Sequence, residues 1–376
     1  MTLNINALGV IPPREYYTKG DWLKGNTMKT VRINASTPYD ILIGNGLLDR
    51  CGELCREVVA PCKACIITDD TVSELYLEKV KSSLDAAGFE TVSFVFPHGE
   101  RSKTTGVLVN ILEFLAQNRI TRSDCLVALG GGVVGDICGF AAAVYMRGIK
   151  FIQIPTTLLA CVDSSVGGKT AVDLEAGKNL MGAFHQPARV ICDYSTLSTL
   201  PPEIFADGCA EVIKYGVIND REFFFELKGG IAENIENVIA RCVENKARIV
   251  EADEFDHGCR QLLNLGHTVG HAIEVCSEFS ISHGSAVAIG TAIVTRASVK
   301  RGSCEKSELD ELISLLSANG LPTECTFSAE QLTAVATADK KRAGDTITLV
   351  VPRAIGNTEL ISIPIDELRE FISLGL

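Results

Sequence analysis

Short apolar segments alternate with longer amphipathic segments through the first half of the chain. The apolar runs have the length of buried strands, and the segments between them repeat apolar residues with the period of a helix. The predicted strands are 64–70, 90–97, 125–132 and 150–155, and the predicted helices are 71–88, 104–118 and 133–148. This alternation predicts an α/β domain with a Rossmann-like parallel sheet.

The pattern changes after the stretch "LSTLPP", and helical periods dominate from there to the end of the chain. Strand-like runs return only briefly, as in 346–352. The predicted helices of this half are 203–217, 231–252, 259–277, 284–300 and 305–318. We therefore predict a loose N-terminal extension at 1–27, an α/β domain at 28–200, and a mainly α-helical C-terminal domain at 201–376.

The composition is that of an ordinary folded protein with an acidic excess. The 376 residues are 46% hydrophobic and 22% charged, and 35 Lys and Arg stand against 47 Asp and Glu, which gives a net charge of −12. This sign is wrong for a nucleic-acid-binding surface. An anionic substrate must be attracted by a local cluster of cations, because the field of the whole chain repels it.

The chain also contains 14 cysteines without a repeated spacing. No signal peptide and no apolar run of membrane-spanning length is apparent, so we expect a cytoplasmic protein with free, mostly buried thiols. A cluster formed by Cys51, Cys55, Cys62 and Cys65 could instead bind zinc. The apolar run that begins at Cys65 favours burial in a core.

A glycine-rich turn follows the strand predicted at 125–132. Gly130, Gly132 and Gly135 fit the G-x-G-x-x-G spacing, in which glycines let a backbone approach a pyrophosphate at a helix N-terminus. The next predicted strand lacks the acidic residue that usually holds the ribose. Asp69 and Glu100, at other strand ends, could take that role. A tight turn without a ligand is the alternative.

The stretch 155–187 is rich in glycine, hydroxyl side chains and charged residues. It carries Asp163, Lys169, Lys178 and Asn179 between apolar runs. Backbone donors, hydroxyls and lysines at this density are typical of a site for phosphate and polyol groups. A solvated surface loop is the alternative, but the flanking apolar runs indicate that the segment is partly covered.

Two histidines four residues apart occur in "NLGHTVGHAIE". Within the helix predicted at 259–277, Arg260, Asn264, His267 and His271 are spaced by 4, 3 and 4 residues, so we expect them on one polar stripe. Thr268 stands where a zinc protease of the His-Glu-x-x-His type carries its glutamate, which excludes that signature. The stripe nevertheless indicates a functional surface.

The same histidines are candidates for a metal site. One carboxylate, two imidazoles and an open position form a typical catalytic zinc arrangement. The candidates for the three ligand positions are Glu211, His267, His271 and His283. From the residues alone, the choice among the histidines stays open.

Eight stretches together resemble the 3-dehydroquinate synthase family of sugar-phosphate cyclases. They lie in that family's order between about residues 64 and 345. The matching stretches are "PHGERSK", "LGGGVVGDICGFAAAVYMRG", "FIQIPTTLLACVDSSVGGKTAV", "GKNLMGAFHQP", "AEVIKYG", "NLGHTVGHAIE", "HGSAVAIG" and "DKKRAG".

The resemblance implies a two-domain cytoplasmic enzyme, expected to be a homodimer, with bound NAD and a divalent metal, Zn²⁺ or Co²⁺. Its substrate would be 3-deoxy-D-arabino-heptulosonate 7-phosphate and its products 3-dehydroquinate and phosphate. The implied reaction comprises transient oxidation by NAD at C5, phosphate elimination, re-reduction, ring opening and aldol closure. Such a reaction would serve the shikimate pathway to chorismate and the aromatic amino acids.

The resemblance also assigns roles to residues. The metal ligands would be Glu211, His267 and His283. The NAD contacts would be Asp69, Glu100, Lys103, Gly131, Gly132, Val133, Asp136, Thr156, Thr157, Lys169, Lys178, Thr196 and Thr199. The catalytic and substrate-binding residues would be Arg147, Asp163, Lys169, Asn179, Lys214, Lys246, Asp256, Arg260, Asn264, His271, and one or both of Lys340 and Lys341.

Three positions depart from the family pattern. Asp256 stands where glutamate is usual, at a position tied to acid-base chemistry. Ser285 stands where glutamate is frequent, and Asp173 where asparagine is common. None of these changes removes a predicted metal ligand or phosphate contact. The alternatives are a sister cyclase acting on another sugar phosphate, a metal-dependent polyol dehydrogenase, and a non-catalytic paralogue.

Overall fold

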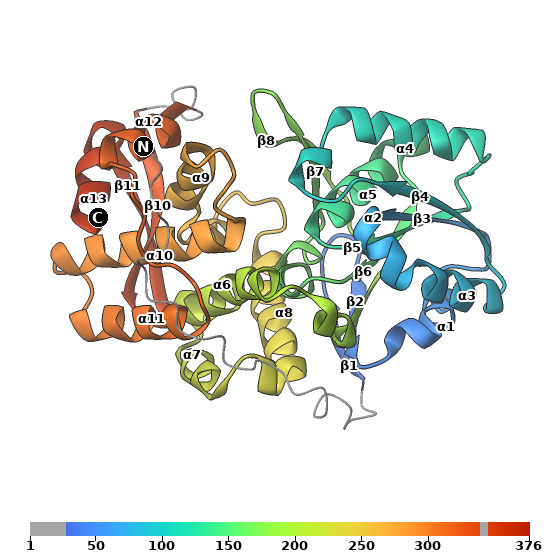
Figure 1. The fold of residues 1–376 in the computed structure, drawn as a ribbon, viewed down its shortest axis with the longest axis horizontal. Helices are drawn as coiled ribbons and strands as arrows, with labels where there is room; N and C mark the ends of the chain where they lie inside the picture. Colours follow the sequence, from blue (N-terminus) through green and yellow to red (C-terminus); the bar gives the residue numbers. More distant parts are fainter. Residues whose placement is uncertain (1–27, 339–344) are drawn as a thin grey trace, which may run out of the picture.

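The computed structural model describes residues 28–338 and 345–376. The predicted N-terminal extension at 1–27 lies outside the described residues, as do Lys340 and Lys341. The described chain forms two lobes side by side, with α6 (Pro202–Asn219) and α8 (Ile235–Ala252) between them (Figure 1). The first lobe contains the large sheet, and the second contains most of the remaining helices.

The large sheet has seven strands in the order β1-β2-β9-β6-β5-β3-β4. All neighbours pair in parallel except β1, which is antiparallel to β2. The strands are β1 (Lys29–Ile33), β2 (Tyr39–Gly44), β3 (Lys63–Asp69), β4 (Glu90–Phe96), β5 (Cys125–Gly130), β6 (Lys150–Pro155) and β9 (Arg189–Asp193). The four predicted strands are β3 to β6, so the predicted Rossmann-like fold class is confirmed.

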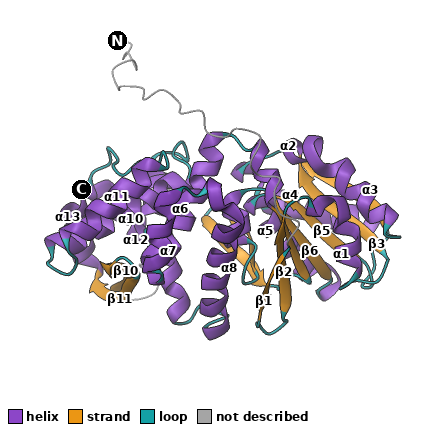
Figure 2. Cartoon of the chain, turned by 90° about the horizontal axis from the view of Figure 1, so that it is seen from below, coloured by secondary structure: helices purple, strands orange, loops and turns teal. Residues whose placement is uncertain are grey.

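Helices cover both faces of this sheet (Figure 2). They are α1 (Cys51–Arg56), α2 (Asp70–Val72), α3 (Glu78–Ala86), α4 (Thr105–Gln117) and α5 (Gly132–Val144). The side chains of β3 alternate between two cores, because successive residues of a strand face opposite sides. Ile66 belongs to the core beneath α1 and α3, whereas Ile67 belongs to the core beneath α4 and α5.

The cysteines are free thiols, ten of them buried. Cys51, Cys55 and Cys65 are fully enclosed in the cores around the sheet. They belong to no group of described residues that is arranged to hold a metal ion. The expectation of free, mostly buried thiols is therefore confirmed.

The second lobe is built mainly from helices around a core shared with α6 and α8. Its other elements are α7 (Arg221–Glu226), α9 (His267–Cys276), α10 (His283–Lys300), α11 (Lys306–Ala318), α12 (Ala329–Ala338), α13 (Leu368–Gly375) and the antiparallel hairpin of β10 (Thr346–Ala354) and β11 (Asn357–Pro364). The helices predicted at 203–217, 231–252, 284–300 and 305–318 are confirmed within a few residues at their ends. In the part of the chain that the structure describes, no helix is both long and apolar enough to cross a membrane.

The single helix predicted at 259–277 is wrong. Cys259–Asn264 form a 3₁₀ helix, and α9 begins only at His267, after Gly266 with φ 77°. A Cβ on Gly266 would lie 2.3 Å from Thr291 Oγ1, so α10 packs directly against this backbone. The chain bends here because only glycine combines the left-handed conformation with such close packing. The expected stripe from Arg260 to His271 is therefore broken.

The stretch 155–187 is partly a hairpin. After a π-helical turn at Ala160–Ser164, β7 (Lys169–Leu174) pairs antiparallel with β8 (Gly177–Phe184). The hairpin projects from the first lobe toward α9 at the top of the molecule (Figure 1). It brings the predicted lysines of this stretch close to the second lobe.

We expect Gly266→Ala to destabilise the protein more than Gly320→Ala. Both glycines have positive φ, which costs an alanine about 1–2 kcal/mol. Only at Gly266 does the added Cβ overlap a neighbouring helix, whereas nothing lies within 4 Å of it at Gly320. Urea unfolding should therefore show a loss of roughly 2–5 kcal/mol for Gly266→Ala. Equal losses in the two variants would contradict the packing argument.

Candidate active site

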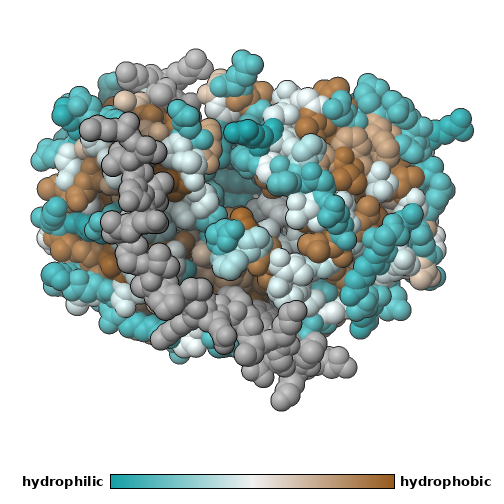
Figure 3. All heavy atoms as spheres, in the orientation of Figure 1, coloured by the Kyte–Doolittle hydropathy of each residue, from teal (hydrophilic) through white to brown (hydrophobic). Residues whose placement is uncertain are grey.

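The predicted cofactor residues gather at the carboxyl ends of the parallel strands. The chain passes from β3 outward to β4 and then returns to the other side of β3 as β5, so the strand order reverses between β3 and β5. Ligands of open α/β sheets bind outside the carboxyl ends at such a reversal. Asp69 ends β3, Gly130 ends β5, and Thr156 follows β6 at this edge. The space-filling view is hollowed between the lobes, where hydrophilic residues gather (Figure 3).

The glycine turn joins β5 directly to α5. Gly131 caps the helix, which begins at Gly132 and continues through Val133. A Cβ on Gly130 would lie 2.5 Å from Val134 Cγ2, so this glycine is required by the turn itself. The hydroxyl of Thr156 is buried and has no hydrogen-bond partner among the described residues. An orphaned buried hydroxyl beside a helix N-terminus fits a ligand such as the pyrophosphate of NAD.

Other predicted cofactor contacts already hold partners in this structure. Lys103 lies 2.6 Å from both Asp136 Oδ2 and Asn179 Oδ1, and Lys178 lies 3.4 Å from Glu100 Oε1. These side chains join the turn after β4, helix α5 and the hairpin into one polar cluster. We therefore expect a bound cofactor to share these side chains with their present partners.

Three threonines and one aspartate of the predicted cofactor contacts make hydrogen bonds within the turns at the carboxyl edge of the sheet. Asp69 Oδ1 accepts a hydrogen bond from Val72 N at 2.8 Å, and Thr157 Oγ1 accepts one from Ala160 N at 3.2 Å. The hydroxyl of Thr199 lies 2.7 Å from Tyr76 OH, which donates to the carbonyl of Thr196. These contacts position the turns around the edge of the sheet.

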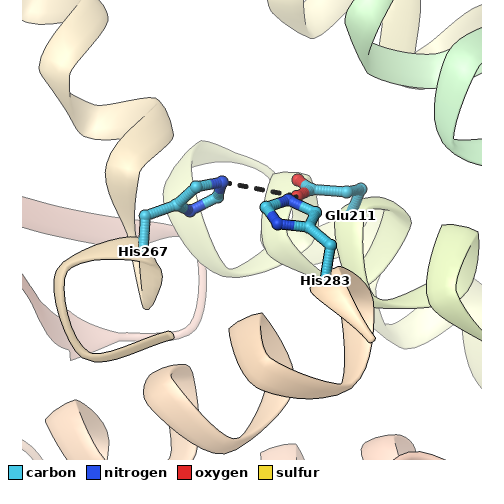
Figure 4. Close-up of side chains that lie close together, drawn as sticks. All are labelled: Glu211, His267 and His283. Carbon is cyan, nitrogen blue, oxygen red and sulfur yellow. Dashed lines mark ion pairs between the residues drawn. The ribbon is translucent and has the colours of Figure 1, made fainter. Parts of the chain in front are cut away.

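The predicted metal ligands converge from three helices (Figure 4). Glu211 comes from α6, His267 opens α9 and His283 opens α10, and one possible ligand atom from each lies within 4.8 Å of the others. The Nε2 atoms of His267 and His283 lie 3.5 and 3.4 Å from Glu211 Oε1. Glu211 has 0% exposure, and within the described ranges its oxygens have ion-pair contacts with Lys214 and the two histidines but accept no hydrogen bond of good geometry.

Each histidine ring is oriented by a hydrogen-bond acceptor at Nδ1, on the side of the ring away from Glu211. Nδ1 of His267 lies 3.0 Å from the carbonyl of Leu265, and Nδ1 of His283 lies 3.4 Å from Glu274 Oε2. A ring that donates from Nδ1 presents the lone pair of Nε2 on its other side. When both rings are neutral, two such lone pairs and an anionic oxygen face one another, and a metal ion between them satisfies all three. The residues therefore fit a Zn²⁺ or Co²⁺ ion.

The electrostatics of the site support the same conclusion. Burial disfavours the charged carboxylate, but Lys214 and His267 hold the pKa of Glu211 well below its ordinary value. Burial likewise disfavours an imidazolium, yet Glu211 and Glu274 raise the pKa of His283 to about 10. The cluster thus strongly favours a positive charge at its centre.

A second group is formed by His271, Glu274 and His283, whose possible ligand atoms also lie within 4.8 Å of one another. The side chain of His271 is 55% exposed, and its Nε2 lies 3.9 Å from Glu274 Oε2. Glu274 Oε1 is paired with Lys178 at 3.1 Å. Glu274 already contacts Nδ1 of His283 and Nζ of Lys178, whereas Glu211 faces the Nε2 atoms of two histidines, so we expect the metal ion at Glu211, His267 and His283. His271 stands beside it, open to a substrate.

A buried cluster of opposite charges adjoins the metal ligands. Lys214 pairs with Glu211, one helical turn away, and lies 3.5 Å from Asp163 Oδ2. Nζ of Lys246 donates to the carboxylate of Asp163 and, at 2.7 Å, to the backbone carbonyl of Asp163. Burial lowers the pKa of Lys246 to about 8, against the pull of Asp163. Burial alone would raise the pKa of Asp163, but the two lysines hold it below its ordinary range.

Arg260 lies close enough to Asp256 and Asp163 to interact with the charges of both. Asp256 has φ 62°, pairs with Lys169, and keeps a buried Oδ1 without a hydrogen-bond partner among the described residues. Arg260 is buried, and its guanidinium donates to the carbonyls of Glu254 and Gly167, the latter at 3.0 Å. The segment bent at Gly266 therefore contributes an acid and a fixed cation rather than a continuous helical stripe.

Two predicted residues are not brought into this cluster. Asn264 is exposed at the end of the 3₁₀ helix. Arg147, with φ 69°, is exposed between α5 and β6, at the edge of the sheet opposite the glycine turn. Their assignment to the site stays a prediction from the family resemblance.

Two of the departures from the family pattern have clear partners. Asp173 Oδ1 accepts a hydrogen bond at 2.7 Å from the backbone of Asn179, which has φ 57°. Ser285 N donates at 3.1 Å to Asp207 Oδ1. Asp173 thus holds a predicted substrate contact in place, and Ser285 holds the start of α10.

Sequence reasoning missed two buried residues, Glu274 and Tyr215. Tyr215 donates to Asp163 Oδ1 at 2.8 Å, and burial, together with Asp163, raises the pKa of Tyr215 well above its ordinary value. The signal for Glu274 was present, since it follows His267 by seven residues and His271 by three, on the same helical face. Nothing in the sequence marked Tyr215, whose role depends on a partner 52 residues away.

Comparisons with known proteins agree with this geometry. Models of the 3-dehydroquinate synthase N-terminal and C-terminal domains match residues 93–207 and 208–342. A 3-dehydroquinate synthase of Streptococcus suis (strain 05ZYH33) is 45% identical, covering 90% of this chain and 98% of the relative.

Two solved structures are similar to most of the chain. A 2-deoxy-scyllo-inosose synthase complexed with carbaglucose-6-phosphate, NAD⁺ and Co²⁺ has a TM-score of 0.83 at 25% identity, covering 93% of this chain and 100% of the other. The 2-epi-5-epi-valiolone synthase ValA of Streptomyces hygroscopicus subsp. jinggangensis 5008, with NAD⁺ and Zn²⁺ bound, has a TM-score of 0.81 at 26% identity, with 89% and 95% coverage.

We expect His267→Ala and His271→Ala to separate metal binding from turnover. His267→Ala should lose zinc, because a site with three protein ligands binds weakly once one imidazole is removed. His271→Ala should keep zinc but lose about 10²–10⁴-fold in turnover, the usual contribution of acid-base assistance. Metal content of the dialysed proteins measures the first effect, and steady-state rates measure the second.

His257→Ala is the matched control for metal content, since His257 is exposed and belongs to neither metal group. A folded, zinc-free His271→Ala variant beside a zinc-bound His283→Ala variant would contradict this ligand set.

Proposed function

The chain belongs to the 3-dehydroquinate synthase family, and on this premise we propose how its described residues perform that family's reaction. The enzyme is an NAD- and metal-dependent carbon–oxygen lyase of the shikimate pathway. It converts 3-deoxy-D-arabino-heptulosonate 7-phosphate to 3-dehydroquinate and phosphate. The reaction comprises transient oxidation at C5, phosphate elimination, re-reduction, ring opening and aldol closure.

The observation that carries the assignment of roles is the convergence of Glu211, His267 and His283 beside a buried cluster of lysines. We propose that these three residues hold the metal ion. When bound, the metal ion supplies a Lewis acid for adjacent substrate hydroxyls, and NAD supplies a reversible hydride acceptor. The glycine turn at Gly130–Gly132, with the orphaned hydroxyl of Thr156, forms the cofactor side of the site.

The substrate carries a carboxylate and a phosphate, so it requires cations. Lys214 and Lys246 lie beside the metal ligands and are held there by Asp163. Arg260 is fixed by backbone carbonyls and so offers a preoriented guanidinium. We assign these groups to binding and orienting the anionic substrate, with Lys169 and Asn179 contributed by the hairpin.

Proton transfer falls to His271 and Asp256 in this proposal. His271 is exposed beside the metal ligands and free to reach a substrate bound there. Asp256 has one buried oxygen without a hydrogen-bond partner among residues 28–338 and 345–376 and a second oxygen paired with Lys169, so it is positioned to accept a proton. Aspartate is one methylene shorter than the glutamate usual here, and the left-handed backbone at Asp256 sets where its carboxylate lies.

We further propose a cytoplasmic homodimer acting on a small sugar phosphate. The 14 free thiols suit a reducing compartment. The dimer follows from the family resemblance alone. We keep the domain boundary near residue 200, between β9 and α6, as part of this proposal.

A chelator should abolish phosphate release from the heptulosonate phosphate, and added Zn²⁺ or Co²⁺ should restore it. The reason is the buried carboxylate and two imidazoles, which lack a central cation once the metal is removed. Phosphate is measured with and without chelator, and residual metal is measured on the same samples. Full activity after verified metal removal would contradict the proposed ligands.

The enzyme should need NAD without consuming it. Oxidation and re-reduction cancel within one turnover, so phosphate should accumulate while absorbance at the NADH wavelength stays flat. A polyol dehydrogenase would instead produce NADH in proportion to product. Glucose 6-phosphate and sedoheptulose 7-phosphate are the control substrates, because turnover of either would indicate a sister cyclase.

A further inference from the structure

Glu274 has no role in the reaction described so far, yet it is one of the most enclosed acids of the site. It lies on α9, seven residues after His267, and is 3% exposed. A carboxylate buried to this degree must be paired with cations or hydrogen-bond donors on all sides. Its two oxygens face two different parts of the molecule.

One oxygen faces the metal site. Glu274 Oε2 lies 3.4 Å from Nδ1 of His283, whose Nε2 lies 3.4 Å from Glu211 Oε1 on the opposite side of the ring. Glu274 favours a proton on Nδ1 of His283. The Nε2 atom of the same ring then carries a lone pair, which is directed at the metal position. Carboxylates behind ligand histidines fix ring orientation and raise ligand basicity. His267 obtains the same orientation from the carbonyl of Leu265.

The other oxygen faces the first lobe. Glu274 Oε1 lies 3.1 Å from Nζ of Lys178, which is carried by β8 and lies 3.4 Å from Glu100 Oε1. The same ammonium stands 4.7 Å above the ring of Phe279, just beyond α9. Lys178 therefore joins the hairpin to the helix that holds a metal ligand.

The hairpin has little apolar packing of its own at this point. Leu180 and Met181 are 53% and 41% exposed, although both are large apolar residues of β8. The other strand of the hairpin is anchored, since Val172 of β7 is fully buried in the core beneath α5. The exposed end that carries Lys178 is held in addition by polar contacts such as the one between Lys178 and Glu274.

We propose that Glu274 is a positioning residue that orients the metal ligand His283 with one oxygen and anchors the β7–β8 hairpin through Lys178 with the other. This inference rests on the proposed function, since it takes His283 as a metal ligand. Glu274 thereby links the metal centre of the second lobe to the hairpin that carries the predicted cofactor and substrate contacts Lys178 and Asn179.

Zinc affinity, measured by competition with a chromophoric chelator, tests the first contact. Glu274→Gln keeps the shape of the side chain, but an amide cannot serve both partners as an acceptor. We expect its zinc affinity to fall about 10–100-fold, the usual effect of losing such a partner. Glu278→Gln removes the same charge from an exposed position just after α9 and should leave zinc affinity unchanged.

Hydrogen exchange of the hairpin amides, measured on the zinc-loaded full chain, tests the second contact. Glu274→Gln and Lys178→Gln should each speed exchange in 175–184 by roughly two- to fivefold, as expected for one partly exposed ion pair. Lys178→Gln leaves the contact between Glu274 and His283 intact, so its zinc affinity should not fall. Glu278→Gln should change neither measurement.

Each part of the inference can fail separately. Wild-type zinc affinity in Glu274→Gln would overturn the role at His283, and unchanged hairpin exchange in both Gln variants would overturn the anchor. If Lys178→Gln weakened zinc as much as Glu274→Gln does, the effect would come from the hairpin rather than from the ring of His283. A wild-type protein that binds no zinc would instead refute the proposed metal centre itself.

A measurement on the unaltered protein covers the case in which Glu274→Gln does not fold. The ¹H–¹⁵N spectrum of the zinc-loaded enzyme should show His283 protonated on Nδ1, with Nε2 bound to the metal. A His283 ring protonated on Nε2 would overturn the proposal.

Discussion

The site depends on one physical constraint, which is that the carboxylate of Glu211 is completely buried and must be neutralised where it stands. Lys214 neutralises one side from the next turn of α6, and the rings of His267 and His283 face the other. The lysine in turn needs Asp163, which belongs to the turn between β6 and β7 in the first lobe. The chain of paired charges that begins at Glu211 therefore runs across the boundary between the lobes.

The same logic explains how a chain of net charge −12 can receive an anionic substrate. Several lysines lie at the candidate site, and each of them is already paired with a carboxylate. Lys246 is paired with Asp163, Lys169 with Asp256, and Lys178 with glutamates of both lobes. We therefore expect substrate and cofactor to compete with these carboxylates for the lysines.

The sequence predicted the local parts of this architecture well. The hydrophobic periodicity of β3 to β6 and of α6, α8, α10 and α11 is a local property of the sequence, so these elements could be predicted from it. The strands β1, β2 and β9 were missed, because their place in the sheet depends on partners as far apart as Ile41 and Val190. The break at Gly266 was missed because its cause, the packing of α10, lies 25 residues further on at Thr291.

The site shows the same division. The histidine spacing indicated metal chemistry but allowed several ligand sets, and family resemblance rather than spacing selected Glu211, His267 and His283. The structure brings these three residues together and also shows that Glu274, in the alternative group, has its oxygens occupied by His283 and Lys178. Such an argument needs distances between helices, which no pattern along the chain contains.

The most direct test of this account is the anomalous scattering of a crystal of the zinc-loaded enzyme, recorded at the zinc absorption edge. The account predicts one strong peak within bonding distance of Glu211 and of the Nε2 atoms of His267 and His283. A peak among His271, Glu274 and His283 instead, or no ordered zinc between these helices, would contradict it.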